Sequence, residues 1–165
     1  MNYSQAIEKL FPAFEQYYTL SKTAEVPFCA RAEFRSHNEQ YLLVRAAHIA
    51  DIDSNEYIYF AAEESINTEK LTFLAEEAWK QGLAKITPYY GHKNSDITLI
   101  IFTEKVDEEV KKTVKKIRKY QSYKFGFFGW SRFKLILAQF PEKNYWSNSH
   151  GSEFKKLIER TFRNA

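Results

Sequence analysis

The chain has 165 residues, of which 44% are hydrophobic and 27% charged, and a formal net charge of +3. These values are typical of a globular protein, and the length suits one domain, residues 1–165, with a substantial core. The single cysteine, Cys29, excludes an internal disulfide, and no apolar run reaches the roughly 20 residues that span a bilayer. Since no leader sequence follows Met1, we expect a cytoplasmic protein.

The first third of the chain predicts one helix followed by strands. Asn2 and Gln5 form a capping box before a helical apolar pattern, and Pro12 interrupts that pattern, so a kink or a restarted helix is expected there. Alternating and apolar runs, separated by turn residues, then predict three strands joined as hairpins. These strands are expected at 28–35, 41–49 and 56–62.

The middle of the chain predicts a helix and a central strand. Asn67 or Thr68 caps the helix, which is expected to stop at Gly82. The apolar run at 97–103 predicts a strand buried on both faces, because a strand covered on one face only would alternate with polar residues. We expect Trp79 to pack against this sheet.

The last third predicts a helix, a strand and a final helix. Asp107 caps the first of these helices, and Asn148 or Ser149 caps the last, with a strand at 132–140 between them. The apolar stripe expected on the first of these helices consists of Val106, Val110, Val114, Ile117 and Gln121. The order α-β-β-β-α-β-α-β-α predicts an α/β (α+β mixed) fold, with one mixed sheet of about five strands covered by helices.

Charge is distributed unevenly along the chain. Between Val110 and Pro141 there is no Asp or Glu but nine Lys or Arg, so the rest has 24 − 9 = 15 basic residues against 21 acidic ones. Aromatic residues are interleaved with the end of this basic tract. The pattern predicts non-catalytic binding of a polyanion such as nucleic acid through residues 111–134. The residues predicted to form this surface are Lys111, Lys112, Lys115, Lys116, Lys119, Tyr123, Lys124, Trp130 and Arg132.

Other interpretations fit the same tract. The lysines can be only the solvated face of an amphipathic helix, with the aromatic residues in the core. The cations can instead face anionic lipid headgroups, or exposed aromatic residues can join copies of the chain into a homo-oligomer. Burial of Phe127, Phe128 and Trp130 would weaken both the stacking and the membrane interpretations.

Catalytic and metal-binding patterns are not recognisable in the sequence. The histidines at 37, 48, 92 and 150 lack a His or Cys partner at metal-ligand spacing, and we expect His92 and Asp96 to form a polar pair in a loop. No glycine-rich phosphate loop is present. We therefore predict no catalytic residue, metal or cofactor, and favour a binding protein over an enzyme.

The order α-β-β-β-α-β resembles the core of restriction-endonuclease-like nucleases. Such sites need an Asp/Glu-x-Lys motif in the third strand, but no Lys stands two places after Glu56 or Glu63. A divergent metal site would use these two residues with Asp51 and Asp53, and Lys93 could supply the cation. Because Glu56 and Glu63 are seven apart, a regular strand places them on opposite faces, so we expect an inactive site.

A second resemblance covers most of the chain. The segments SYKFGFFGWSRFKL (122–135), YWSN (145–148) and GSEFKKL (151–157), with NEYIY (55–59), resemble an uncharacterised family of small bacterial single-domain proteins, a domain of unknown function. The resemblance implies a recurring aromatic and glycine segment at 123–131 and a helix opened by a small-residue cap near Asn148. It implies no activity.

Overall fold

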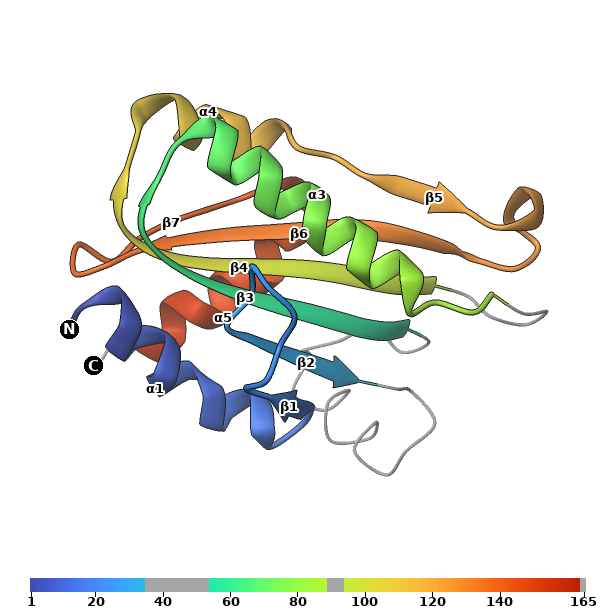
Figure 1. Cartoon of the computed structure of the whole chain (residues 1–165), viewed down its shortest axis with the longest axis horizontal. Helices are drawn as coiled ribbons and strands as arrows, with labels where there is room; N and C mark the ends of the chain where they lie inside the picture. The colour runs from blue at the N-terminus through green and yellow to red at the C-terminus, as the bar shows by residue number, and fades with distance from the viewer. Residues whose placement is uncertain (35–53, 89–93, 164–165) are drawn as a thin grey trace.

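The computed structural model describes residues 1–34, 54–88 and 94–163. Within these ranges, a seven-stranded sheet has helices on both faces (Figure 1). The helices are α1 (Tyr3–Glu15), α3 (Thr68–Ala84), α4 (Glu108–Lys116), α5 (Ser152–Arg163) and the 3-10 helices η1 (Lys124–Gly126) and η2 (Ser149–Gly151). The strands are β1 (Thr19–Ser21), β2 (Ala30–Phe34), β3 (Ser54–Ile66), β4 (Asn94–Val106), β5 (Tyr120–Ser122), β6 (Trp130–Gln139) and β7 (Asn144–Ser147).

The strand order is β1-β2-β3-β4-β6-β5, and β7 also pairs with β6. Strands β3, β4 and β6 are parallel to one another, while β1, β2, β5 and β7 pair antiparallel. The expected mixed α/β sheet is therefore confirmed. It has more strands than expected because β1, β5 and β7 are only three or four residues long, too short to show a clear alternation in the sequence.

The central strand is β4, and its residues Ile97, Leu99, Ile100, Ile101 and Phe102 are all fully buried. Successive side chains point to opposite faces, so this burial requires cover on both sides. On one side, Ile100 and Phe102 join the core under α1 and α5, and on the other, the odd-numbered residues join the core under α3 and α4. The prediction of a strand buried on both faces is confirmed.

Two helices differ from expectation because of their surroundings. The capping box at Asn2 is present, but α1 continues through Pro12 without a restart. Pro12 is exposed, so water can satisfy the carbonyl of Glu8 that loses its donor. Helix α3 extends past Gly82 to Ala84. A Cβ at Gly82 would lie 2.7 Å from the Ile97 side chain, so this glycine permits close packing on the sheet instead of ending the helix. Trp79 packs edge-on against Phe133 with ring centroids 6.1 Å apart, as expected.

Helix α4 is shorter than its apolar stripe predicts. It ends at Lys116, and the chain becomes extended at Ile117 before pairing with β6 as β5. Strand pairing outweighs the helical period over these residues, as tertiary contacts commonly do. The expected hairpin turn and strand at 36–49 lie outside the described residues. In the described part of the chain, no helix has both the length and the apolar character needed to cross a membrane.

Candidate nucleic-acid interface

A projecting hairpin, which we call the arm, comprises residues 118–132. It contains β5, the tip and the start of β6, and it extends beyond the amino ends of β3 and β4 (Figure 1). Backbone hydrogen bonds close the tip: the Tyr123 N–H donates to the Gly129 carbonyl at 2.9 Å, and the Phe128 N–H donates to the Tyr123 carbonyl at 3.1 Å. The tip is thus a defined loop.

The tip holds aromatic side chains in solvent. Phe125 is 100% exposed and Phe127 is 74% exposed. Phe125 also adopts a left-handed backbone conformation with φ 54°, between Lys124 at φ 49° and Gly126 at φ 92°. The left-handed region costs an L-residue about 1–2 kcal/mol. Both the conformation and the exposure of Phe125 oppose folding stability, and such strain is often found at functional sites.

One face of the arm combines exposed aromatic rings with cations. Tyr120 is directly opposite Arg132 in the β5–β6 ladder, and Trp130 is opposite Ser122, so all four side chains lie on the α5 side of the sheet. Tyr120 is 64% exposed and Trp130 is 37% exposed. The β5–β6 pairing continues one residue before Tyr120, because the Phe133 N–H donates to the Lys119 carbonyl. Side chains alternate between the two faces along this extended segment, so Arg118 lies on the same side as Tyr120. We call Arg118, Tyr120, Trp130 and Arg132 the aromatic face.

The opposite face of the arm turns toward α3. The Tyr123 hydroxyl lies 2.8 Å from the Ser131 hydroxyl in a hydrogen bond, and burial raises the pKa of Tyr123. Gln121, opposite Ser131 in the ladder, shares this side. Tyr123 and Trp130 were predicted to act together, but they lie on different faces because their positions in the ladder have opposite parity.

Arg132 is held by a buried carboxylate. Its Nε donates to Asp96 Oδ1 at 2.9 Å and its Nη2 to Asp96 Oδ2 at 3.4 Å, while the Asp96 side chain is fully buried. The Lys134 ammonium bonds Asp96 and Glu56, each at 2.8 Å. Thr98 donates to the second Glu56 oxygen at 3.3 Å. We call Glu56, Asp96, Arg132 and Lys134 the charge cluster; its two carboxylates balance its two cations.

Lys134 is a fixed positive charge in this cluster. Burial disfavours its charged form, but the Glu56 and Asp96 carboxylates outweigh that effect and raise the pKa of Lys134 well above its usual value. A permanently protonated ammonium cannot act as a base or nucleophile at neutral pH. We infer that the cluster ties β3, β4 and β6 together and orients the Arg132 guanidinium, as bidentate carboxylate pairs do.

The charge cluster was not predicted from the sequence. Asp96 was assigned to a polar loop pair with His92, but it is a buried residue of β4, and His92 lies outside the described residues. The available signal was Lys134, a lone cation between Phe133 and a run of apolar residues in a predicted strand. A buried lysine needs a carboxylate partner, although the sequence does not identify which one.

His150, in η2, lies close to the aromatic face. Burial, followed by the charges of Arg132 and Arg118, lowers the pKa of His150, while Asp96 has the opposite effect. The Asn148 side chain explains this proximity: its Nδ2 donates to the Ile117 carbonyl at 3.1 Å, and its Oδ1 accepts from the Gly151 N–H at 3.0 Å. One amide therefore joins the start of the arm to the turn that holds His150.

The predicted lysines of α4, and Lys119 after it, do not lie on the aromatic face. Lys111 pairs with Glu108 and lies 5.6 Å from the centre of the Trp146 ring, and Lys119 pairs with Glu76 of α3. Helix α4 follows the carboxyl end of β4, whereas the arm tip projects beyond the amino end of that strand (Figure 1). The exposed lysines of α4 are Lys112, Lys115 and Lys116.

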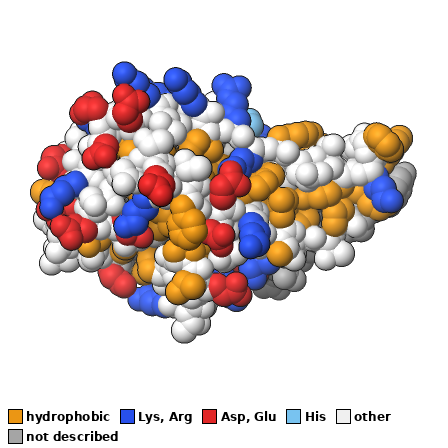
Figure 2. Space-filling view, turned by 45° about the horizontal axis from the view of Figure 1, so that its top comes forward, with side chains coloured by type: hydrophobic (Ala, Val, Ile, Leu, Met, Phe, Trp, Pro, Cys, Tyr) orange, Lys and Arg blue, Asp and Glu red, His pale blue; other side chains and the backbone are white. Residues whose placement is uncertain are grey.

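The nine predicted site residues are therefore not one surface. Four belong to α4, Lys119 and Tyr123 lie on the α3 side of the arm, and Lys124 is exposed at the tip. Of the nine, Trp130 and Arg132 share the aromatic face. Figure 2 shows acidic and basic side chains interspersed over the broad part of the molecule and hydrophobic side chains along the narrow projecting end. Phe127 and Trp130 are exposed and Phe128 is half-buried, so the stacking and membrane interpretations keep their main premise.

The residues considered for a metal site do not converge. Glu56 belongs to the charge cluster under α5, whereas Glu63 pairs with Lys70 of α3 on the other face of the sheet. Their predicted placement on opposite faces is confirmed. Asp51, Asp53 and Lys93 lie outside the described residues, and among those described no group of three or more His, Cys, Asp or Glu could hold a metal ion.

Comparison with known proteins gives one match. Residues 2–160 match a family described as a domain of unknown function, DUF8052. No curated protein and no solved structure matches the chain. The resemblance to an uncharacterised domain family, expected from segments such as 122–135, is therefore confirmed.

Proposed function

The chain belongs to this DUF8052 family of unknown function, and from the chemistry of its arm we propose that it binds single-stranded nucleic acid without catalysis. The observation that carries the proposal is the aromatic face: Tyr120 and Trp130, 64% and 37% exposed, lie on the same side of the hairpin as Arg118 and Arg132. Exposed aromatic rings within a cationic groove are the usual means of binding unpaired bases.

The geometry favours single strands over duplexes. Tyr120 and Trp130 are diagonal neighbours in the ladder, so their backbones are about 7–8 Å apart and their rings can contact neighbouring bases. Stacking on a base requires access to its flat face, which a duplex hides. The aromatic face contains no helix that could enter a major groove.

Charge complementarity supports the same partner. Arg118 and Arg132 lie beside Tyr120 on the aromatic face, Lys124 is at the tip, and no acidic residue occurs from 110 to 141. Asp96 fixes the Arg132 guanidinium, which lowers the entropy lost when that side chain contacts a phosphate. A reducing compartment such as the cytoplasm suits a chain whose sole cysteine is Cys29.

The proposal is tested by fluorescence anisotropy with labelled single-stranded DNA and RNA, and with a duplex of the same sequence, at low salt. We expect single strands to bind more tightly than the duplex. Replacing both Tyr120 and Trp130 with Ala should weaken single-strand binding about 30-fold or more, because each stacked base contributes about 1–3 kcal/mol. The matched control is Phe73→Ala, which removes a 53% exposed ring from α3.

Two further outcomes would contradict the proposal. One is an absence of binding at tens of micromolar protein in low salt, since non-specific binders commonly reach about 10⁻⁴–10⁻⁶ M even at physiological salt. The other is equal loss of binding in Phe73→Ala and in the double variant. Vesicles containing anionic lipid serve as a competitor: if they displace no oligonucleotide and bind no protein, the membrane interpretation of the exposed Phe125 and Phe127 is rejected.

A further inference from the structure

The tip of the arm, residues 123–129, leaves two aromatic rings in solvent. Phe125 is fully exposed and Phe127 is largely exposed. Burying a phenylalanine side chain stabilises a protein by removing apolar surface from water, and these two rings forgo that stabilisation. They belong to the end of a projecting hairpin, which a partner can approach from outside (Figure 1). The free protein therefore presents an apolar surface at the end of the arm.

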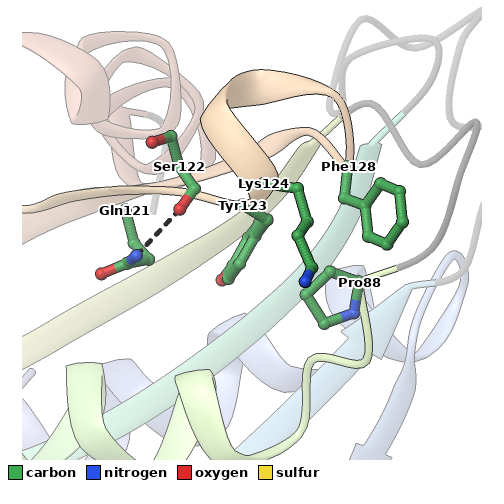
Figure 3. A pocket seen from close by; sticks show the side chains of 6 residues that line it. All are labelled: Pro88, Gln121, Ser122, Tyr123, Lys124 and Phe128. Atoms are coloured by element: carbon green, nitrogen blue, oxygen red, sulfur yellow. Dashed lines mark hydrogen bonds between the residues drawn. The ribbon is translucent and has the colours of Figure 1, made fainter.

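Other side chains of the tip face the body of the protein. Tyr123, Lys124 and Phe128 line one pocket together with Pro88, on the α3 side of the arm, as Figure 3 shows. The two exposed phenylalanines are not part of this lining. The tip thus has one side that packs toward α3 and an end that presents only the two rings.

The backbone of the tip holds these rings in place. The Gly126 N–H donates to the Tyr123 carbonyl at 3.0 Å, and the Phe127 N–H donates to the Lys124 carbonyl at 3.0 Å, in addition to the hydrogen bonds that close the tip. Gly126 has φ 92°, a conformation that only glycine adopts without cost. A closed loop loses less conformational entropy on binding than a flexible one, so the rings are preorganised for contact with a rigid surface.

The surroundings of the tip favour a nucleic acid as the partner. The aromatic face leads to the tip, since Trp130 is the residue of the β5–β6 ladder nearest to it and Tyr120 is two positions further away. Lys124 is exposed at the tip, and no acidic residue occurs from 110 to 141, so this end of the arm attracts phosphates. A strand that follows the aromatic face toward the tip brings whatever adjoins it to the two exposed rings.

The shape of the tip selects which part of a nucleic acid it fits. A fully exposed ring such as Phe125 has no protein wall opposite it, so it does not enclose a base in a groove. It stacks instead on a flat surface that the partner presents. Inside a duplex every base pair is covered by its neighbours, and only the last pair exposes a whole face. Apolar wedges, phenylalanine among them, contact base faces in this manner in other nucleic-acid-binding proteins.

We propose that Phe125 and Phe127 stack on the terminal base pair of a duplex whose single-stranded tail crosses the aromatic face. The preferred substrate is then the junction between a duplex and a single strand. This proposal deepens the proposed function and rests on it, because Tyr120 and Trp130 hold the tail. The arm in this arrangement marks the position at which base pairing ends.

The test measures the fluorescence anisotropy of labelled DNA probes with the full chain. The probes are a single strand of about ten nucleotides, a blunt duplex, and the same duplex carrying that strand as a tail. We expect the tailed duplex to bind at least fivefold more tightly than the single strand, the lower limit for one stacking contact, and the blunt duplex to bind least. This advantage should persist as salt is raised, because stacking releases no counterions.

The decisive variant changes Phe125 and Phe127 together to Ala. It should remove the advantage of the tailed duplex and leave the affinity for the single strand unchanged. Both side chains are exposed, so the variant should fold normally, and its binding of the single strand checks that it does. The matched control is Phe73→Ala, which removes an exposed ring from α3 and should change neither affinity.

Several outcomes would overturn the junction proposal. One is equal affinity for the tailed duplex and the single strand, and another is an advantage that the double variant keeps. Equal loss of both affinities in the double variant would mean that the rings contact the strand itself. If the double variant keeps the advantage but no longer binds vesicles of anionic lipid, the tip is a lipid contact instead.

The two proposals fail in different ways. If the single strand binds and loses affinity on replacement of Tyr120 and Trp130, but the tailed duplex has no advantage, the junction proposal is overturned and the aromatic face stands. If duplex ends bind through Phe125 and Phe127 but the single strand does not bind, the strand-binding function is overturned instead.

Discussion

Helix α4 and the arm come from the same basic tract, but they place their apolar side chains in opposite environments. In α4, Val110 and Val114 are fully buried and lysines cover the outside, the ordinary pattern of an amphipathic helix. In the arm, Tyr120, Phe125 and Phe127 are more than 60% exposed. The amphipathic pattern of α4 accounts for its exposed lysines without a binding partner. Aromatic rings exposed beside cations are not accounted for in this way and indicate a partner. The location of the apolar residues, more than the charge, therefore distinguishes a candidate binding surface.

The largest expected effect is a loss of folding stability when the Asn148 side chain, which connects the end of α4 to β6 and η2, is removed. The buried Asn148 amide donates to the Ile117 carbonyl, directly after α4, and to the Phe133 carbonyl at 2.9 Å. Its oxygen accepts from the Leu135 N–H at 3.0 Å and from the Gly151 N–H. Asn148→Ala should lower the free energy of unfolding by about 3 kcal/mol, because several backbone groups lose their partners in a buried place. Urea denaturation measures this change.

Asn144→Ala is the control for that experiment. Asn144 lies on the surface of β7 and makes one side-chain hydrogen bond, with Gln139. Its replacement should change the free energy of unfolding by less than about 0.5 kcal/mol. If the two variants were equally stable, the hydrogen bonds of Asn148 would not be what positions the arm beside η2.

The second prediction separates the cations of the arm from those of α4. If phosphates contact Arg118, Lys124 and Arg132, log K should fall with log salt concentration with a slope of about −2, since each contact on a single strand contributes about −0.7. Arg118→Glu should weaken binding about tenfold. Changing Lys112, Lys115 and Lys116 together to Glu should leave the slope nearly unchanged. A slope near −4 that this triple variant reduces to −2 would mean that α4 also binds the strand.

The third prediction concerns pH and the aromatic face. Burial, Arg132 and Arg118 lower the pKa of His150 in the free protein. A phosphate bound nearby adds negative charge, which raises that pKa, so binding takes up a proton. Affinity should therefore rise as pH falls from 7.5 to 5.5, by up to about tenfold for each unit by which the pKa increases. Anisotropy titrations across this range should show the rise in the unmodified chain and its loss in His150→Gln.

The smallest expected effect compares two rings of the tip. Phe125→Gly should raise the free energy of unfolding by about 0.5–1 kcal/mol, because glycine adopts φ 54° without the penalty paid by other residues. Phe127 has φ −64°, so Phe127→Gly gains nothing in the folded state and should lower stability by about 0.5–1 kcal/mol. Thermal denaturation of both variants tests this. Equal destabilisation would show that the Phe125 backbone carries no strain.

The residue pattern was sufficient for the regular elements. Repeated apolar spacing gave α1, α3 and α5, and the run from Ile97 to Phe102 gave the central strand with its burial on both faces. Opposite faces for Glu56 and Glu63 followed from strand parity alone. These features depend on neighbouring residues, so they can be inferred without knowing which strands pair.

The site could be predicted only as a segment. Residues 111–134 were identified by their charge and aromatic content, but the pairing of β5 with β6 decided that Trp130 and Arg132 share a face and that Tyr123 lies on the other. The pattern extended the α4 stripe to Gln121, and the short β5 gave too few residues for a period of two to be recognised.

The amino-acid sequence by itself determined the α/β class, the helix caps at Asn2 and Asn67, the central strand and the position of a basic, aromatic tract. Only the tertiary structure decided that Asp96 and Glu56 meet Lys134, that Phe125 is exposed in a left-handed conformation, and that the Asn148 side chain bonds the Ile117 carbonyl. The reason is physical: caps and periodicity arise from residues a few positions apart, whereas these contacts join segments up to 78 positions apart, and strand order and register determine them.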